Sequence, residues 1–153
     1  MRPRRLLVLC LLAVAGTAAG CGGDAEAKNA YVDDVQVAQR AFVSRFDQVR
    51  GRLTATSTIA QDRRTLTDFA GAARRFTTEL REITPPEAVR QEHAGLMAAV
   101  DETTRGLEAA AARLRDGSAR ARARVRTELS SGIEAGQERI VAAIAAINTA
   151  LRE

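Results

Sequence analysis

Aromatic residues, histidine and proline are scarce in this sequence, and each shortage excludes a class of function or fold. There is no tryptophan, four Phe and one Tyr supply all the aromatic rings, and there is one histidine. A single histidine excludes the paired Glu-x-x-His motifs of di-iron bundles, and the C-x-x-C-H sequence of covalent haem attachment is absent. We therefore expect neither a metal nor a cofactor. Only three prolines interrupt 153 residues, which favours long helices in a single domain.

Cysteine is confined to the first 21 residues, at Cys10 and Cys21. The rest of the chain holds no thiol for a disulfide or a metal site, so packing alone must stabilise it. Residues 1–5 carry three arginines, residues 6–15 are apolar, and residues 16–20 are small. That order is typical of a secretory signal peptide, and the apolar run is shorter than the roughly 20 residues of a membrane-spanning helix.

The sequence Ala18-Ala19-Gly20-Cys21 resembles the lipobox of bacterial lipoproteins, with Ala18 where that family prefers Leu. The resemblance implies that a diacylglyceryl group alkylates the Cys21 thiol and that the chain is cut before it. The protein would then be lipid-anchored at the extracytoplasmic face of the cell membrane. The alternative is cleavage by ordinary signal peptidase after Ala19, which would leave a secreted protein. In overall type the chain resembles the small helical lipoproteins of high-GC bacteria.

These observations divide the chain into three expected parts. They are a signal peptide at residues 1–20, a lipidated flexible tether at residues 21–28, and a helical domain at residues 29–153. Arginine provides 22 of the 23 basic residues, and the formal net charge is +4. Removal of Arg2, Arg4 and Arg5 with the signal peptide leaves 20 basic and 19 acidic residues, a net charge of +1. A nearly neutral chain gives no general reason to bind nucleic acid.

From residue 29 onward, apolar residues recur at steps of three and four, as at Leu66, Phe69, Ala73 and Phe76. This period predicts four amphipathic helices, at residues 29–54, 58–83, 85–115 and 118–152. Residues 58–61 and 84–87 both fit a capping box, and Ser118 fits a helix N-cap. Short connections force neighbouring helices to run antiparallel. We therefore expect an all-α fold, an up-down-up-down antiparallel four-helix bundle.

Two features of the predicted helices indicate how they pack. Folding the first hairpin near residue 56 places Phe42 level with Phe69, and Phe46 level with Leu66, which predicts an aromatic cluster. Five glycines lie singly inside the predicted helices, and we expect close helix contacts at each. They are Gly71, Gly95, Gly106, Gly132 and Gly136.

His93 lies on the apolar stripe of the third predicted helix, four residues before Met97. We expect a structural side chain that is hydrogen-bonded near Glu92 or to a neighbouring helix. The alternative is that His93 and Met97 line a site for a small apolar ligand or cofactor. The serines would have to share one histidine, and no pair of carboxylates is singled out, so the sequence argues against an enzyme.

Arginines are concentrated around the third predicted connection, where six of them and one acidic residue lie between residues 113 and 126. The six are Arg113, Arg115, Arg120, Arg122, Arg124 and Arg126. Positive charge at a helix N-terminus opposes the helix dipole by roughly 0.3 kcal/mol or more each, so local stability does not favour this arrangement. One interpretation is an anion-binding tip, and the other is a solvated helix end in an arginine-rich proteome. No aromatic residue interleaves with these arginines, which argues against single-stranded nucleic acid.

The predicted topology separates charge along the bundle. Residues 45–68 and 105–128, which lie far from Cys21, carry 12 basic and 6 acidic residues, a net charge of +6. The rest of the mature chain carries a net charge of −5. We therefore expect a non-catalytic binding or scaffold module of the cell envelope, whose basic end meets an acidic envelope polymer or protein. The alternative function is a carrier of a small apolar ligand or cofactor within the bundle.

Overall fold

A computed structural model of the chain describes residues 22–50, 52, 54, 56–116 and 118–153. For residues 22, 23, 50, 116, 126, 129–131, 133 and 134 it describes the backbone alone. The elements are α1 (Gly22–Arg50), α2 (Ile59–Glu82), the 3₁₀ turn η1 (Glu87–Val89), α3 (Arg90–Arg113), the 3₁₀ turn η2 (Leu114–Asp116) and α4 (Ala119–Ala150). The described ranges contain no strand, so the predicted all-helical fold is confirmed.

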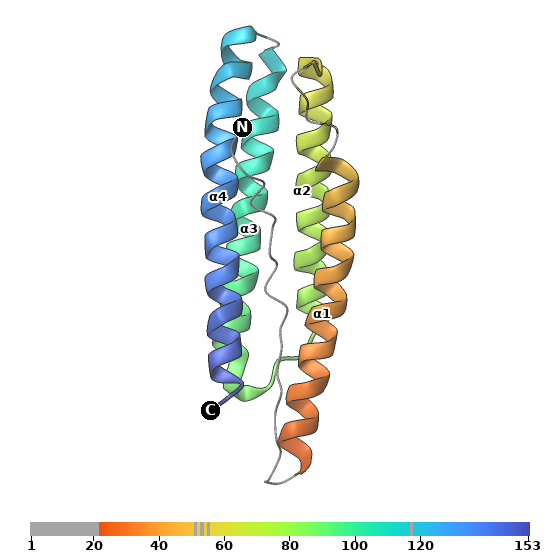
Figure 1. The fold of residues 1–153 in the computed structure, drawn as a ribbon, viewed down its shortest axis with the longest axis vertical. Helices are drawn as coiled ribbons and strands as arrows, with labels where there is room; N and C mark the ends of the chain where they lie inside the picture. Colours follow the sequence, from red (N-terminus) through yellow and green to blue (C-terminus); the bar gives the residue numbers. More distant parts are fainter. Residues whose placement is uncertain (1–21, 51, 53, 55, 117) are drawn as a thin grey trace, which may run out of the picture.

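The helices lie side by side along one long axis (Figure 1). α2 packs against both α1 and α3, and α3 packs against α4. One end of the molecule is formed by the first turns of α2 and α4 and the last turn of α3; we call it the arginine end. The opposite end holds the start of α1, the α2–α3 connection and the C-terminus. α1 stops short of the arginine end and projects beyond the other helices at the opposite one.

The first predicted helix has different bounds in the structure, because α1 begins at Gly22 and ends at Arg50. Residues 22–28 are therefore helical and do not form the flexible tether that the sequence suggested. Ala25, Glu26 and Ala27 are strong helix formers, and Lys28 Nζ donates a hydrogen bond to the Leu151 carbonyl oxygen at 3.1 Å. This contact joins the early part of α1 to the end of α4.

Helix caps agree with the sequence at two of the three predicted places. Thr58 and Gln61 form the predicted capping box, with Thr58 Oγ1 accepting from the Gln61 amide at 3.2 Å and Gln61 Oε1 accepting from the Thr58 amide at 2.7 Å. Ser118 Oγ accepts from the Ala121 amide at 3.1 Å. The capping box predicted at Thr84 is wrong, because α3 begins only at Arg90, after η1. A residue that precedes proline is disfavoured in the helical region of backbone conformation. Thr84 and Pro85 each precede a proline, so the helix cannot start at them.

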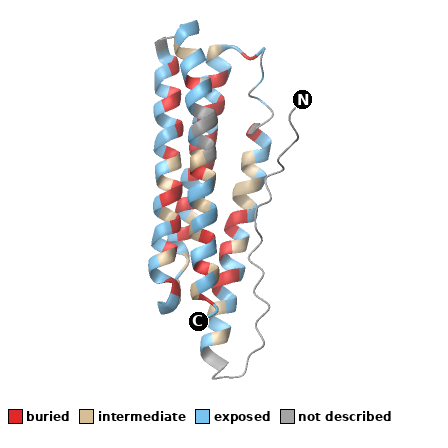
Figure 2. Ribbon diagram, turned by 60° about the vertical axis from the view of Figure 1, so that its left-hand side comes forward, coloured by how far each residue is buried: buried red, intermediate tan, exposed pale blue. Residues whose placement is uncertain are grey.

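Buried residues form stripes on the inward sides of the helices (Figure 2) and gather into two core clusters. The cluster nearer the C-terminus includes residues from all four helices, among them Tyr31, Val35, Phe76, Leu80, Leu96, Val100, Ile144 and Ile147. The cluster nearer the arginine end includes Val49, Leu66, Phe69, Leu107, Leu114 and Val125. Burial of this apolar surface supplies the main driving force for folding.

Four phenylalanines connect the two clusters, and they confirm the predicted aromatic cluster. The ring of Phe42 stacks on that of Phe76 with centroids 4.9 Å apart, and Phe46 lies 4.5 Å from Phe69. The predicted register is wrong, since it paired Phe42 with Phe69 and Phe46 with Leu66. The connection between α1 and α2 spans residues 51–58 rather than a tight turn near residue 56, which moves α2 relative to α1.

Close helix contact at glycine is found at one of the five predicted positions. A Cβ atom added at Gly136 in α4 would lie 2.8 Å from Thr103 Oγ1 in α3. Cβ atoms added at the other four glycines would meet no atom within 4 Å, so the prediction is wrong for Gly71, Gly95, Gly106 and Gly132.

Candidate functional site

The sequence singled out six arginines, and the structure describes the side chains of five of them, all at the arginine end. The side chain of the sixth, Arg126, lies outside the described part. α3 delivers Arg113, η2 delivers Arg115, and the first turns of α4 deliver the remaining three. Helical geometry places residues two apart on well-separated faces. Arg122 and its neighbours Arg120 and Arg124 therefore have different surroundings.

Arg122 forms a structural contact between α4 and α2. Its Nε donates to Asp62 Oδ2 at 2.8 Å, and its Nη2 donates to the Ser57 carbonyl oxygen. Ser57 Oγ lies within hydrogen-bonding distance of both Asp62 Oδ1 and the Thr54 carbonyl oxygen, and its one hydrogen serves one of them at a time. Asp62 is only 5% exposed. Arg122 is thus occupied by a buried carboxylate, and we remove it from the predicted anion-binding set.

Arg113 is also paired, because its Nη1 donates to Glu128 Oε2 across the α3–α4 contact. Both side chains are more than half exposed, and exposed pairs of this kind contribute about 0.2–1 kcal/mol. Arg115, Arg120 and Arg124 are exposed and have no ion pair within the described residues. These three side chains remain available for an outside anion.

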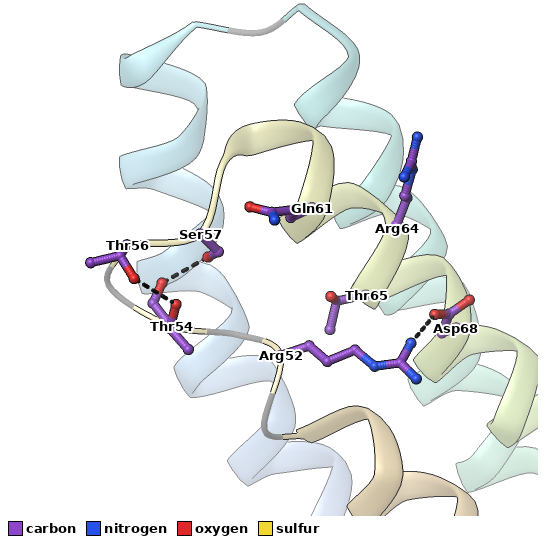
Figure 3. A pocket seen from close by; sticks show the side chains of 8 residues that line it. All are labelled: Arg52, Thr54, Thr56, Ser57, Gln61, Arg64, Thr65 and Asp68. Carbon is purple, nitrogen blue, oxygen red and sulfur yellow. Dashed lines mark hydrogen bonds and ion pairs between the residues drawn. The ribbon is translucent and has the colours of Figure 1, made fainter.

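A polar hollow lies beside the arginine end, between the α1–α2 connection and the first turns of α2 (Figure 3). Its volume is about 420 Å³, and its lining consists of Arg52, Thr54, Thr56, Ser57, Gln61, Arg64, Thr65 and Asp68. Arg52 Nη1 donates to Asp68 Oδ2 at 2.9 Å across it. Sequence reasoning missed this hollow, although the run Thr54, Thr56, Ser57 between two helices was a visible polar signal.

His93 is buried and tied to two neighbouring helices. Its Nε2 lies 3.0 Å from the Leu80 carbonyl oxygen of α2, and its Nδ1 lies 3.1 Å from the Tyr31 hydroxyl of α1. A carbonyl oxygen only accepts, so Nε2 carries the hydrogen, and Nδ1 then accepts from the Tyr31 hydroxyl. The Tyr31 ring meets the His93 ring edge-on, with centroids 5.7 Å apart. These bonds use both ring nitrogens.

The surroundings of His93 keep this pair neutral. Burial lowers the pKa of His93, and the hydrogen bond from Nε2 to Leu80 offsets only part of that effect. Burial, and next the nearby carboxylate of Glu92, raise the pKa of the Tyr31 hydroxyl. Met97 is half-buried and packs against the same core cluster. We therefore describe His93 as a structural side chain.

A second hollow, of about 450 Å³, lies along α3 and α4 and is lined in part by Thr103, Gly106, Leu107 and Gly132. Neither hollow includes His93 or Met97. Within the described ranges, no three His, Cys, Asp or Glu side chains are grouped closely enough to hold a metal ion. No helix of the described part is both long and apolar enough to span a bilayer. Cys21 and residues 1–20 lie outside the described residues.

Comparison with known proteins gives no family assignment: no protein-family model, no curated protein and no solved structure matches this chain. Function must therefore be argued from the site itself.

Proposed function

We propose that this chain is a lipoprotein anchored through Cys21 at the extracytoplasmic face of the membrane. Its helices form an up-down-up-down four-helix bundle, and it acts as a non-catalytic module that binds or scaffolds an anionic component of the cell envelope. The observation that carries the proposal is the set of exposed arginines Arg115, Arg120 and Arg124 at one end of the bundle. α1, the helix that follows Cys21, starts at the other end (Figure 1).

Electrostatics supports binding at the arginine end. The N-termini of α2 and α4 and the C-terminus of α3 all lie there. A helix carries about half a positive charge at its N-terminus and about half a negative charge at its C-terminus, so the three helix ends together leave a positive potential. Exposed guanidinium groups add to that potential, and those of Arg120 and Arg124 do so against the local stability of α4. A concentrated positive field raises the association rate of an anionic partner and makes that rate sensitive to salt.

A binding module is favoured over a carrier for an apolar ligand by the surroundings of His93. Both of its ring nitrogens are bonded to the protein, so neither is left to orient a ligand. Met97 packs against core side chains instead of facing either hollow. The large exposed hydrophobic side chains within the described part are Val37 and Val141, on different helices.

The test is reversal of charge at the arginine end. In the triple variant Arg115→Glu, Arg120→Glu and Arg124→Glu, we expect capture of the envelope partner by crosslinking in intact cells to fall at least about tenfold at low salt. The matched control reverses three exposed arginines outside this end: Arg40→Glu, Arg75→Glu and Arg152→Glu. Equal capture by the two variants would refute the proposal, because both carry the same net charge.

A further inference from the structure

The polar hollow of Figure 3 has a lining that packing does not explain. Thr65 is the clearest case: it is 3% exposed, yet its hydroxyl has no hydrogen-bond partner among the described residues. Figure 3 shows its side chain in the hollow, between those of Gln61 and Arg52. The buried side-chain polar atoms without a hydrogen-bond partner in the described residues are Arg45 Nη1, Glu79 Oε2 and Asn148 Oδ1. Thr65 Oγ1 is instead open to the hollow, where it can bond to water or to a ligand.

Other groups in the lining offer further hydrogen bonds. Gln61 Oε1 is used by the Thr58 amide in the capping box, which leaves the amide Nε2 of Gln61 free to donate. Thr54 and Thr56 share one hydrogen bond of 3.2 Å, so their hydroxyls keep one hydrogen between them for another acceptor. Neutral groups that both donate and accept match the hydroxyls of a sugar or polyol.

Charge in the hollow favours an anion. The lining holds two guanidinium groups, those of Arg52 and Arg64, and one carboxylate, that of Asp68, which leaves one positive charge in excess. The guanidinium of Arg52 has five N–H donors and spends one of them on Asp68, so it can hold a second anionic group. No aromatic ring lines the hollow, which disfavours stacking with a base.

One wall of the hollow, at Ser57, is held in place by a contact from α4. Ser57 belongs to the lining, and its carbonyl oxygen accepts from Arg122, which also pairs with the buried Asp62. The contact ties the connection to α4, so the wall does not depend on α2 alone. A site whose walls are fixed by such supporting contacts loses less entropy when it binds.

We propose that this hollow is a binding site for a sugar or polyol unit that carries one carboxylate or phosphate group. The inference deepens the proposed function and rests on it, because it names the chemistry of the anionic partner. The anionic group pairs with Arg52 and Arg64, and the neighbouring hydroxyls bond to Thr65, to the amide of Gln61 and to Thr54 or Thr56. The volume of about 420 Å³ lies within the usual range for small-ligand sites.

The experiment is a titration of the purified full-length protein, labelled at threonine methyl groups, followed by NMR at constant ionic strength. The four probes are glucose 6-phosphate, glucuronate, glucose and inorganic phosphate. We expect glucose 6-phosphate, glucuronate or both to shift the methyl signals of Thr54, Thr56 and Thr65, with a Kd of about 1 mM for an open site. Glucose alone and phosphate alone should bind at least about tenfold more weakly, because each offers half of the contacts.

Three variants test the assignment. Thr65→Val keeps the shape and removes the hydroxyl, and it should weaken binding by about fivefold. The pair Arg52→Gln and Arg64→Gln should weaken it by about tenfold or more, and both residues are exposed, so folding is expected to survive. The control pair Arg40→Gln and Arg75→Gln removes the same charge at exposed positions outside the hollow and outside the arginine end, and it should leave binding unchanged.

Several results would overturn the inference. It fails if no probe shifts the three threonines, if phosphate alone binds as tightly as glucose 6-phosphate, or if the control pair weakens binding as much as the pair in the hollow. The relative affinity of glucuronate and glucose 6-phosphate separates a carboxylate from a phosphate source. If the partner is still captured through Arg115, Arg120 and Arg124 but no probe binds in the hollow, this inference is wrong and the proposed function stands.

Discussion

At the scale of single residues, Arg120 and Arg122 show how two positions in one arginine-rich run acquire opposite roles. Arg122 lies three residues before the buried Val125, on the same face of α4, and reaches the buried Asp62. Arg120 faces away and is exposed. The sequence held a signal for this difference, because Asp62 lies four residues before Leu66 and continues the apolar stripe of α2. A charged residue on an apolar stripe indicates a buried pair, although its partner is fixed only by the packing of α2 against α4.

His93 provides a residue-scale prediction about pH. Its pKa in the folded protein lies below the ordinary value of 6.5, so the unfolded chain binds this proton more tightly. Above about pH 7 both states are neutral and the full contribution of His93 is present. As the pH falls through 6.5 toward the folded-state pKa, stability should fall by up to about 1.4 kcal/mol per pH unit.

Urea unfolding between pH 5 and pH 8 measures this effect, with the non-titrating variant His93→Gln as the reference. Since His93 is the only histidine, and the carboxylates are common to both proteins, the difference in slope belongs to this side chain. Parallel pH profiles for the two proteins would contradict the neutral His93 described above.

At the scale of elements, sequence patterns identified the four helices and missed where two of them, α1 and α3, begin or end. Apolar steps of three and four, with the caps at Thr58 and Ser118, located α2 and α4 to within two residues. The start of α1 was missed because the glycines at 22 and 23 suggested a tether, and that of α3 because two prolines delay it. The register of α1 on α2 depends on the path of residues 51–58, which no periodicity specifies.

The contact of α3 with α4 leads to a second prediction, on glycine. Gly136→Ala should destabilise the protein by about 1–3 kcal/mol, because the new Cβ would meet Thr103 Oγ1, which is held by a 2.9 Å bond to the Ala99 carbonyl oxygen. Gly106→Ala is the control: it places a Cβ in open space and should stabilise α3 by up to about 1 kcal/mol. Unfolding midpoints in urea measure both. A gain in stability at both positions would show that the helices do not approach closely at Gly136.

At the scale of the whole molecule, charge and topology were predicted together. The sequence placed the basic residues in segments that the fold brings to one end, and Figure 1 shows the start of α1 at the other. Which arginines stay available was beyond the sequence, since Arg113 and Arg122 are occupied by acidic residues of other elements. Of the hollow only the polar run Thr54, Thr56 and Ser57 was visible in the sequence, because its walls come from α2 and from an irregular connection.

Anchoring at the membrane is tested at this scale by cell fractionation. The variant Cys21→Ala should move from the membrane fraction to the soluble fraction, because two acyl chains suffice for stable anchoring and no described helix could replace them. Cys10→Ala alters the other cysteine, inside the predicted signal peptide, and should stay with the membrane. Labelling with a fatty-acid analogue should mark the parent protein and Cys10→Ala, but not Cys21→Ala. Membrane retention of Cys21→Ala, or an unlabelled parent, would exclude the lipid anchor.

The early start of α1 has a mechanical consequence for an anchored molecule. In the proposed lipoprotein, α1 would begin at the residue after the acylated Cys21 and would hold the bundle at a fixed distance from the membrane, whereas a run of unstructured residues would let that distance vary. α1 has 29 residues and measures about 44 Å at 1.5 Å per residue. The arginines at the far end would then stay at a nearly constant distance from the bilayer. The protein would then find a ligand fixed at that distance by diffusion in two dimensions. A shorter or longer α1 would place the arginines at a different distance, where they would not meet the ligand.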